Sequence, residues 1–379
     1  METDEVVRRR LAGLGLASAP GVIDGAGALG AFGAFGDPVD VVRRLGAVQA
    51  QDYGPALWSL GRRTGLPEAV VEQPLRAGAL LRTHVLRPTW HLVPAEELLR
   101  LQDLTKDRVH ALNAHYYRRN GLDEATFRRS DRVVEAAVGE AGELTREALR
   151  AALVAAGLDV GDLRATLMVM HAELEGIVCS GVRQGRRQTF ALVADRVADS
   201  LPLDRDAALA DLTRRYFSSH GPASVKDFGW WSSLRRANLE RGLALAGERL
   251  RRDEVDGIAV WSAADAPQVV DAGDGPAVRL VQAYDEYVVG YSETKYLLDR
   301  AGLARGRPGG AAVFNQHLLV DGQVTGCWRR ATTARAVTVE VTPDRPLTPA
   351  EHAGLEVEAQ ACAGFLGRTL DLRVSEPVR

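Results

Sequence analysis

The chain has 379 residues, of which 46% are hydrophobic and 26% charged, and its formal net charge at pH 7 is -3. These values are ordinary for a globular protein with room for two or three domains, and a charge so close to zero argues against a general binder of polyanions. No stretch is long and apolar enough to span a bilayer, and the acidic start of the chain lacks the apolar run of a signal peptide. We therefore expect a cytoplasmic protein with no membrane partner.

Only three of the 47 basic residues are lysines. Arginine is favoured where phosphate is contacted by two hydrogen bonds at once, but the base composition of a genome produces the same bias, and both explanations stay open. Cys179, Cys327 and Cys362 are widely separated and match no metal-ligand spacing. We expect reduced, buried thiols, with no bound metal and no cofactor.

Residues 1–36 are rich in glycine and alanine, and we interpret them as an N-terminal arm. The run Arg8-Arg9-Arg10 either touches phosphate as part of a mobile arm or forms one solvated face of a helix.

A first winged-helix-like unit is expected over residues 37–121. Asp37 and Pro38 are a suitable cap and first residue of a helix. Gly54-Pro55 should break that helix soon afterwards. The hydrophobic residues between them follow one helical stripe: Val41, Val42, Leu45 and Val48. This pattern predicts a helix that ends near Val48. The rest of the unit is expected to contain a helix from Pro55, helices over 67–76 and 94–120, and strands over 80–86 and 89–93.

Gln49 and Gln51 follow that first helix with one alanine between them. Residues two apart point to nearly opposite sides of a helix but to the same side of an extended segment. An extended linker after Val48 would therefore present both amides together. The alternative is that they are two polar residues at a frayed helix end.

A second winged-helix unit is expected over residues 122–200. Helices are predicted over 132–139 and 146–156, helical spacing continues over 163–177, and two strand-like runs over 177–192 form a hairpin wing. Three arginines lie at the wing tip: Arg183, Arg186 and Arg187. Glu173 and Glu175 near the end of the preceding helix would suit a phosphate-lined groove poorly. We therefore expect the wing, rather than the helix, to hold DNA backbone.

A third winged-helix-like unit is expected over residues 201–262, with helices over 206–218, 224–232 and 235–248 and strand-like residues over 250–260. Its last helix has a basic N-terminal half that suits phosphate contact: Arg235, Arg236 and Arg241. Residues 263–379 predict a mostly antiparallel β-sheet or small barrel with one helix over 348–366. Asp321-Gly322 between two apolar runs is a strong hairpin signal. The predicted fold class is thus α+β, with about three tandem winged-helix units before a β-rich domain.

Four segments resemble one known family. Val48-Gln49-Ala50-Gln51, the run from Arg87 to His91, the Tyr284-Asp285-Glu286 segment and the stretch from Val320 to Arg329 are similar to segments of the AlkZ/YcaQ group of DNA glycosylases, which are winged-helix proteins. The resemblance covers about residues 41–373. The Gln-apolar-Gln form is similar to the azinomycin-resistance branch of that family, whereas the other branch carries an aspartate.

The resemblance implies a monofunctional DNA glycosylase that removes bulky or crosslinking N7-alkylated purines from duplex DNA as a monomer, in self-resistance to a genotoxin. Gln49 and Gln51 would be catalytic, and His91 is a possible support because it lies in the matching segment. Asp52 is either a further catalytic group or the cap of the next helix. Arg87 is either a phosphate clamp or a member of a buried ion pair. The alternative function is a non-catalytic winged-helix DNA-binding protein or regulator.

Overall fold

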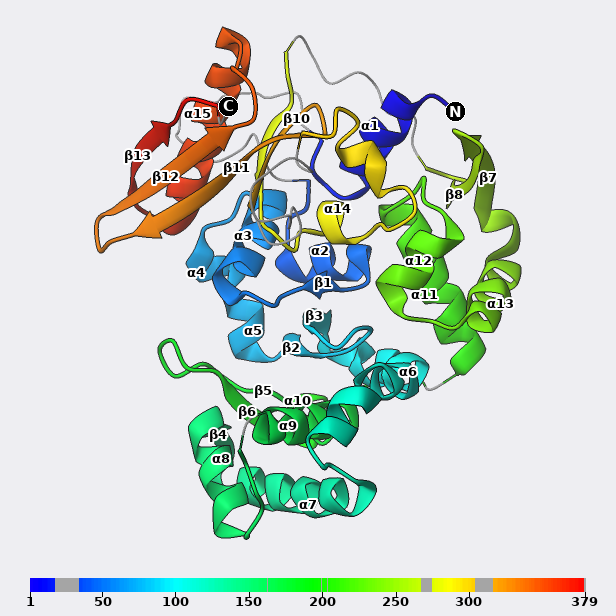
Figure 1. The fold of residues 1–379 in the computed structure, drawn as a ribbon, viewed down its shortest axis with the longest axis vertical. Coiled ribbons are helices and arrows are strands. Elements are labelled where there is room, and N and C mark those ends of the chain that lie inside the picture. Colours follow the sequence, from blue (N-terminus) through cyan, green and yellow to red (C-terminus); the bar gives the residue numbers. More distant parts are fainter. Residues whose placement is uncertain are drawn as a thin grey trace. The chain divides into compact units, whose positions relative to one another are not determined.

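The computed structural model describes residues 1–17, 34–161, 163–198, 200–202, 204–266, 275–303 and 316–377. They belong to two compact units (Figure 1). Unit 1 comprises Met1–Glu72, Leu212–Trp231 and Ala246–Arg379, and unit 2 comprises Gln73–Asp211 and Ser232–Leu245. Much of the predicted N-terminal arm, residues 18–33, lies outside the described residues, and the part before it forms α1 (Thr3–Gly13).

The first helices of unit 1 lead into the Gln49 segment. In α2 (Pro38–Leu45) the Asp37 side chain accepts the N–H of Val39, as a helix cap does. The helix ends three residues before the predicted end at Val48, because Gly46 adopts φ 85°, a backbone conformation that favours glycine. β1 (Val48–Gln49), α3 (Tyr53–Thr64) and α4 (Glu68–Val71) follow.

The C-terminal part of unit 1 is a five-stranded sheet in the order β13-β12-β11-β10-β9. The strands are β9 (Val278–Val281), β10 (Gln316–Val320), β11 (Gln323–Thr332), β12 (Ala336–Pro343) and β13 (Thr369–Val374). β9 to β12 pair antiparallel, whereas β13 pairs parallel to β12 after α15 (Pro349–Leu366), which packs on the sheet. The predicted mostly antiparallel sheet and the helix predicted over residues 348–366 are confirmed.

Shorter elements complete unit 1. β7 (Leu250–Val255) and β8 (Ile258–Ala263) form an antiparallel hairpin where strand-like residues were predicted. The helical elements are α12 (Val225–Ser232), η2 (Gly247–Arg249), α14 (Glu286–Val289) and η3 (Lys295–Leu298). α11 (Arg205–Ser219) and α13 (Arg236–Ala246) each include residues of both units.

Unit 2 begins with α5 (Gln73–Ala77) and an antiparallel hairpin of β2 (Leu80–His84) and β3 (Trp90–Pro94), followed by η1 (Ala95–Glu97) and α6 (Leu98–Arg119). The single helix predicted over residues 67–76 was wrong, since α4 and α5 are separate. Pro74 has no backbone N–H for a continuous helix, and it is tolerated where it stands because this is the first turn of α5.

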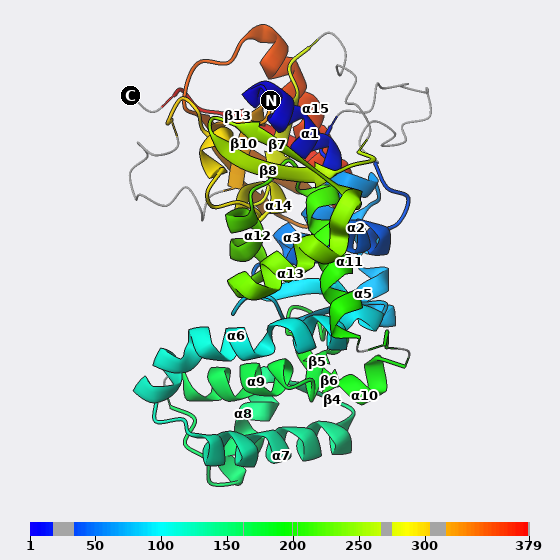
Figure 2. The ribbon, with the colours of Figure 1, turned by 90° about the vertical axis from the view of Figure 1, so that its right-hand side faces the viewer.

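The remainder of unit 2 contains the predicted helices and hairpin, with one additional strand and one additional short helix. The elements are α7 (Glu124–Ala141), β4 (Glu143–Thr145), α8 (Arg146–Ala155), α9 (Arg164–Leu174), β5 (Val178–Ser180), β6 (Thr189–Leu192) and α10 (Val193–Arg196). Their sheet has the order β4-β6-β5, and the helices enclose a core that includes Phe127, Val134, Leu149 and Phe190. Figure 2 shows α6, α9 and α7 in successive layers, as their contacts require. The α+β class is confirmed, whereas the number of winged-helix units and the five domain boundaries stay predictions.

No described helix combines the length and apolar character needed to cross a membrane.

Candidate functional site

The backbone of Gln49 is extended, as the sequence predicts. β1 contains Gln49, a bend follows at Gln51 and Asp52, and α3 starts at Tyr53. Gly54 and Pro55 do not end a helix here, because Pro55 lies in the first turn of α3, where its missing N–H costs nothing. The frayed-helix alternative for the two glutamines is therefore wrong.

Gln49 is held by its backbone. Its N–H donates a hydrogen bond of 2.7 Å to Oε1 of Glu286, and its carbonyl oxygen accepts one of 3.4 Å from the Gln282 amide. Only 6% of Gln49 is exposed, whereas Gln51 is half-buried. The backbone N–H and carbonyl of Gln49 both have buried hydrogen-bond partners, and these bonds fix the position of the segment.

Asp52 occupies the N-cap position of α3 and is exposed. Among the described residues, its side chain accepts no capping hydrogen bond from this helix. The cap that the sequence suggested is therefore not formed. Burial of Tyr284 and the negative charge of Asp52 together raise the pKa of the Tyr284 phenol, which places Asp52 close to the Tyr284-Asp285-Glu286 segment.

Glu286 is the residue that the sequence interpretation missed. It is fully buried, and its Oε2 accepts the indole N–H of Trp231 at 2.8 Å, with Nε2 of His220 at 3.4 Å. The His220 ring is stacked on Tyr216. A carboxylate buried this deeply is retained only when donors surround it. Glu286 thereby connects Gln49 to α12 and to the buried aromatic cluster of unit 1.

Asp285, the neighbour of Glu286, forms a second buried link. Both of its oxygens lie 2.8 Å from the guanidinium of Arg63, and Ser59 donates to it at 2.7 Å. Burial alone would raise the pKa of Asp285, but Arg63, Ser59 and the N–H of Tyr287 outweigh it and lower that pKa. Asp285 and Glu286 lie at the start of α14, where Asp285 is the N-cap.

A pocket of about 730 Å³ beside α2 was also not foreseen. Its lining includes Arg44, Arg214 and Arg249, together with Ser218 and Asp265. Burial and the nearby Arg214 lower the pKa of Arg44, whose guanidinium donates to the Ser218 carbonyl at 2.6 Å. Three arginines around one opening suit a phosphate group. The sequence could not show this grouping, because the three arginines come from separate segments of the chain.

In unit 2, Arg87 and His91 contact each other. Arg87 is 9% exposed, and its guanidinium lies 3.1 Å from Nε2 of His91, while Nδ1 of His91 lies 2.9 Å from the Thr89 carbonyl. The two contacts fit a neutral ring that donates through Nδ1 and accepts through Nε2. Burial, followed by the charge of Arg87, lowers the pKa of His91 well below 6.5. His91 is thus a neutral, fully buried group that orients Arg87.

Trp90 lies between two arginines of unit 2. The guanidinium of Arg82 is 4.3 Å from the centre of the ring and that of Arg146 is 5.3 Å away. The indole N–H donates to Glu173 at 3.2 Å, and Nδ1 of His84 is 2.6 Å from the same carboxylate. The expectation that Glu173 contributes to an acidic helix surface was therefore wrong, because Glu173 is fully buried.

The predicted wing is formed by β5 and β6. Arg186 and Arg187 are exposed at its tip, and Arg183 is half-buried, with its guanidinium donating to the Arg186 carbonyl at 2.6 Å. Exposed arginines on a hairpin tip can reach phosphate without displacing a buried partner.

The three predicted arginines near α13 differ in their surroundings. All are exposed, and Arg235 directly precedes the helix. Arg236 forms an ion pair with Glu240, and Arg241 forms one with Asp206. A phosphate contact by either of these two would have to replace an existing partner.

Residues 42–365 match the family model for AlkZ-like proteins, described as DNA glycosylase AlkZ-like. The solved structure of Streptomyces sahachiroi DNA glycosylase AlkZ is similar to this chain with a TM-score of 0.75 at 23% sequence identity, over 99% of this chain and 100% of that one. At this identity the likeness shows a shared fold. No curated protein matches the chain.

Proposed function

Because the chain belongs to the AlkZ-like DNA glycosylase family, we propose that it hydrolyses the N-glycosidic bond of N7-alkylated purines in duplex DNA, with Gln49 and Gln51 as its catalytic residues. The observation that carries this proposal is the extended backbone at Gln49, whose N–H is bound to the buried carboxylate of Glu286. The substrate class and the residue roles are part of the proposal.

Neutral amides suit this substrate. Alkylation at N7 puts a positive charge on the purine, so the base leaves as a neutral molecule and needs no strong acid. What remains is to place a water molecule and to stabilise the oxocarbenium-like sugar. A glutamine carbonyl can accept from water while its NH2 group donates to a sugar or phosphate oxygen, and no charge has to be desolvated.

Gln51 is the more accessible of the two amides, since it is half-buried and Gln49 is almost fully enclosed. We assign water and sugar positioning to the pair jointly. Asp52 follows on the exposed side, where its negative charge would favour a developing sugar cation. Glu286 is a positioning residue, because it acts on Gln49 through the main chain.

The proposed chemistry is hydrolysis without strand cleavage. A Schiff base with the opened sugar requires an amine, and the segment from Gln49 to Asp52 has none. We therefore propose a monofunctional enzyme that leaves an abasic site. His91 is not assigned a proton-transfer role, because both of its ring nitrogens are engaged and its pKa is low.

DNA would be held mainly through phosphate. The wing arginines Arg183, Arg186 and Arg187 are the proposed contacts in unit 2, with Arg235 before α13 as a further one. Contacts of this kind give salt-sensitive binding with little preference for sequence. We propose that the protein acts as a monomer on DNA in the cytoplasm, and that it protects its host from a genotoxin that forms bulky or crosslinking adducts.

The test is to incubate the protein with duplexes that carry N7-methylguanine, a nitrogen-mustard adduct or a bulky natural-product adduct, and to measure abasic sites. We expect base release from at least one of these duplexes and none from undamaged DNA. Retained DNA binding without release from any of them would reject the glycosylase proposal and favour the non-catalytic DNA-binding alternative.

A further inference from the structure

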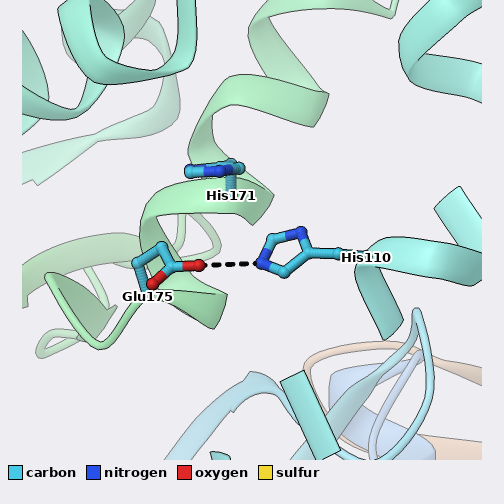
Figure 3. Close-up of side chains that lie close together, drawn as sticks. All are labelled: His110, His171 and Glu175. Atoms are coloured by element: carbon cyan, nitrogen blue, oxygen red, sulfur yellow. Dashed lines mark hydrogen bonds and ion pairs between the residues drawn. The ribbon is translucent and has the colours of Figure 1, made fainter. Parts of the chain in front are cut away.

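Three side chains in unit 2 converge on one another. His110 lies on α6, His171 lies on α9, and Glu175 is the residue that follows α9 (Figure 3). One possible ligand atom from each lies within 4.8 Å of the others. His171 and Glu175 are four residues apart, so the helix places both on one face.

The distance between two of the three groups suits a small cation. Nε2 of His110 is 3.0 Å from Oε1 of Glu175. Zinc bonds of about 2.0–2.2 Å in a tetrahedral site put neighbouring ligand atoms roughly 3.3 Å apart. The pair therefore needs only a small shift to share an ion. Side-chain exposures of 21% for His110, 17% for His171 and 32% for Glu175 leave the cluster open to one.

Each histidine also has a partner on its second ring nitrogen, Nδ1. Nδ1 of His110 is 3.0 Å from the hydroxyl of Tyr117, and Nδ1 of His171 is 3.0 Å from the carboxylate of Asp131. Phe127 stacks on the His171 ring with centroids 4.1 Å apart. Partners of this kind on the second ring nitrogen fix the tautomer and the orientation of metal-binding histidines.

The Glu175 carboxylate is divided between two neighbours. Oε2 is 2.8 Å from Nζ of Lys106, which leaves Oε1 toward the histidines. Oε1 is therefore the carboxylate oxygen that an ion shared with the histidines would contact.

We propose that His110, His171 and Glu175 bind one divalent transition-metal ion, zinc by preference, through Nε2 of each histidine and Oε1 of the glutamate. Two imidazoles and one carboxylate are ligands that zinc accepts, and a water would complete a four-coordinate site. The ion joins α6 to α9 and stabilises unit 2. This inference goes beyond the proposed glycosylase activity and does not rest on it. It also departs from the sequence expectation of no metal, which considered only the cysteines.

The test is to strip the full chain with a chelator, titrate it with Co2+ while following the visible absorption of the bound ion, and then displace Co2+ with Zn2+. We expect one equivalent to bind and the thermal unfolding midpoint to rise. H110A and H171A should each weaken binding by more than about 100-fold, since loss of an outer partner already costs about 10–100-fold. Asp131→Asn, which alters such a partner, should fall within that range.

The matched control is His115→Ala, because His115 is an exposed histidine on the same helix. It should bind Co2+ as the unaltered chain does. Glu175→Gln keeps the size of the side chain and serves if an alanine variant fails to fold, which circular dichroism would reveal. The proposal is overturned if the unaltered chain binds no Co2+ or Zn2+, if folded H110A, H171A or E175Q binds as tightly as the unaltered chain, or if H115A loses binding to the same extent as H110A.

Discussion

The backbone N–H of Gln49 donates a 2.7 Å hydrogen bond to the carboxylate of Glu286, a residue 237 positions further along the chain. This bond makes the position of the glutamine segment depend on α14 and on the aromatic neighbours of Glu286. The predictions for unit 1 follow from this dependence.

Gln49→Ala and Gln51→Ala should each abolish most base release from an N7-alkylguanine duplex and leave DNA affinity within about tenfold, or roughly 1.4 kcal/mol. The reason is that the amides are proposed to act on water and sugar, whereas phosphate contacts provide the affinity. Single-turnover release and fluorescence anisotropy on the same duplex separate the two effects. Equal loss of binding and release would assign the glutamines to DNA binding.

Glu286→Gln should lower both base release and stability. The amide offers one acceptor oxygen where the carboxylate offers two, so either the Gln49 N–H or the Trp231 indole loses its acceptor, at a cost of about 1–3 kcal/mol. Urea unfolding measures the cost. Trp231→Phe is the matched control, because it removes the indole donor and keeps the Gln49 bond. A stronger loss of release in the control than in E286Q would contradict the positioning role.

Acid should weaken unit 1 through Asp285. The pKa of this carboxyl is lowered in the folded protein, so its contribution is present above the unfolded value of about 3.9 and is lost as pH falls through the lower folded value. Breaking the pair with Arg63→Met should cost about 3–5 kcal/mol, because it leaves a buried charge. Unfolding followed from pH 7 to pH 2 should show a shallower acid loss in D285N. An unchanged slope would mean that the pair does not control it.

His91 should cause a second pH effect on stability, at higher pH than that of Asp285. Its folded pKa lies well below 6.5, so below about pH 6.5 the unfolded chain takes up a proton that the folded chain does not, and stability falls. His91→Gln removes this titration and should flatten the pH dependence of the unfolding free energy between about pH 5 and pH 7. Denaturant titrations at several pH values compare the two proteins, and identical curves would refute the neutral buried state.

The wing arginines should determine part of the salt dependence of DNA binding. Arg186→Ala combined with Arg187→Ala should reduce the slope of log affinity against log salt by up to about one per arginine. Arg128→Ala is the control, since Arg128 is exposed on α7 and forms an ion pair with Glu124. If the double variant keeps the full slope, the wing does not contact phosphate.

Local sequence signals predicted the parts of the fold that depend on neighbours in the chain. The Asp37-Pro38 start and the extended glutamine segment were predicted, as was the turn at Asp321 and Gly322, where both residues have positive φ values of 49° and 74°. The early end of α2 was not predicted, because a glycine between apolar residues is compatible with a helix until its φ is known.

Partners of buried polar groups could not be predicted. Periodicity identifies the face of an element that is buried, but it does not say which carboxylate meets which donor on another element. Glu173 was expected on an acidic helix face and no partner was predicted for Glu286, yet both are fully buried and hydrogen-bonded to tryptophan. The convergence of His110 on His171 and Glu175 likewise depends on how α6 packs against α9.

Unit 1 is built from three separate segments of the chain, and this affects when it can fold during synthesis. The unit is assembled from residues 1–72, 212–231 and 246–379, so its first stretch leaves the ribosome long before the other two exist. Gln49 is synthesised early, but its acceptor Glu286 belongs to the last stretch. A chain whose translation stops before Glu286 therefore lacks the group that fixes the glutamine segment. The Gln49 segment can therefore reach its ordered position only in nascent chains that have been synthesised past Glu286.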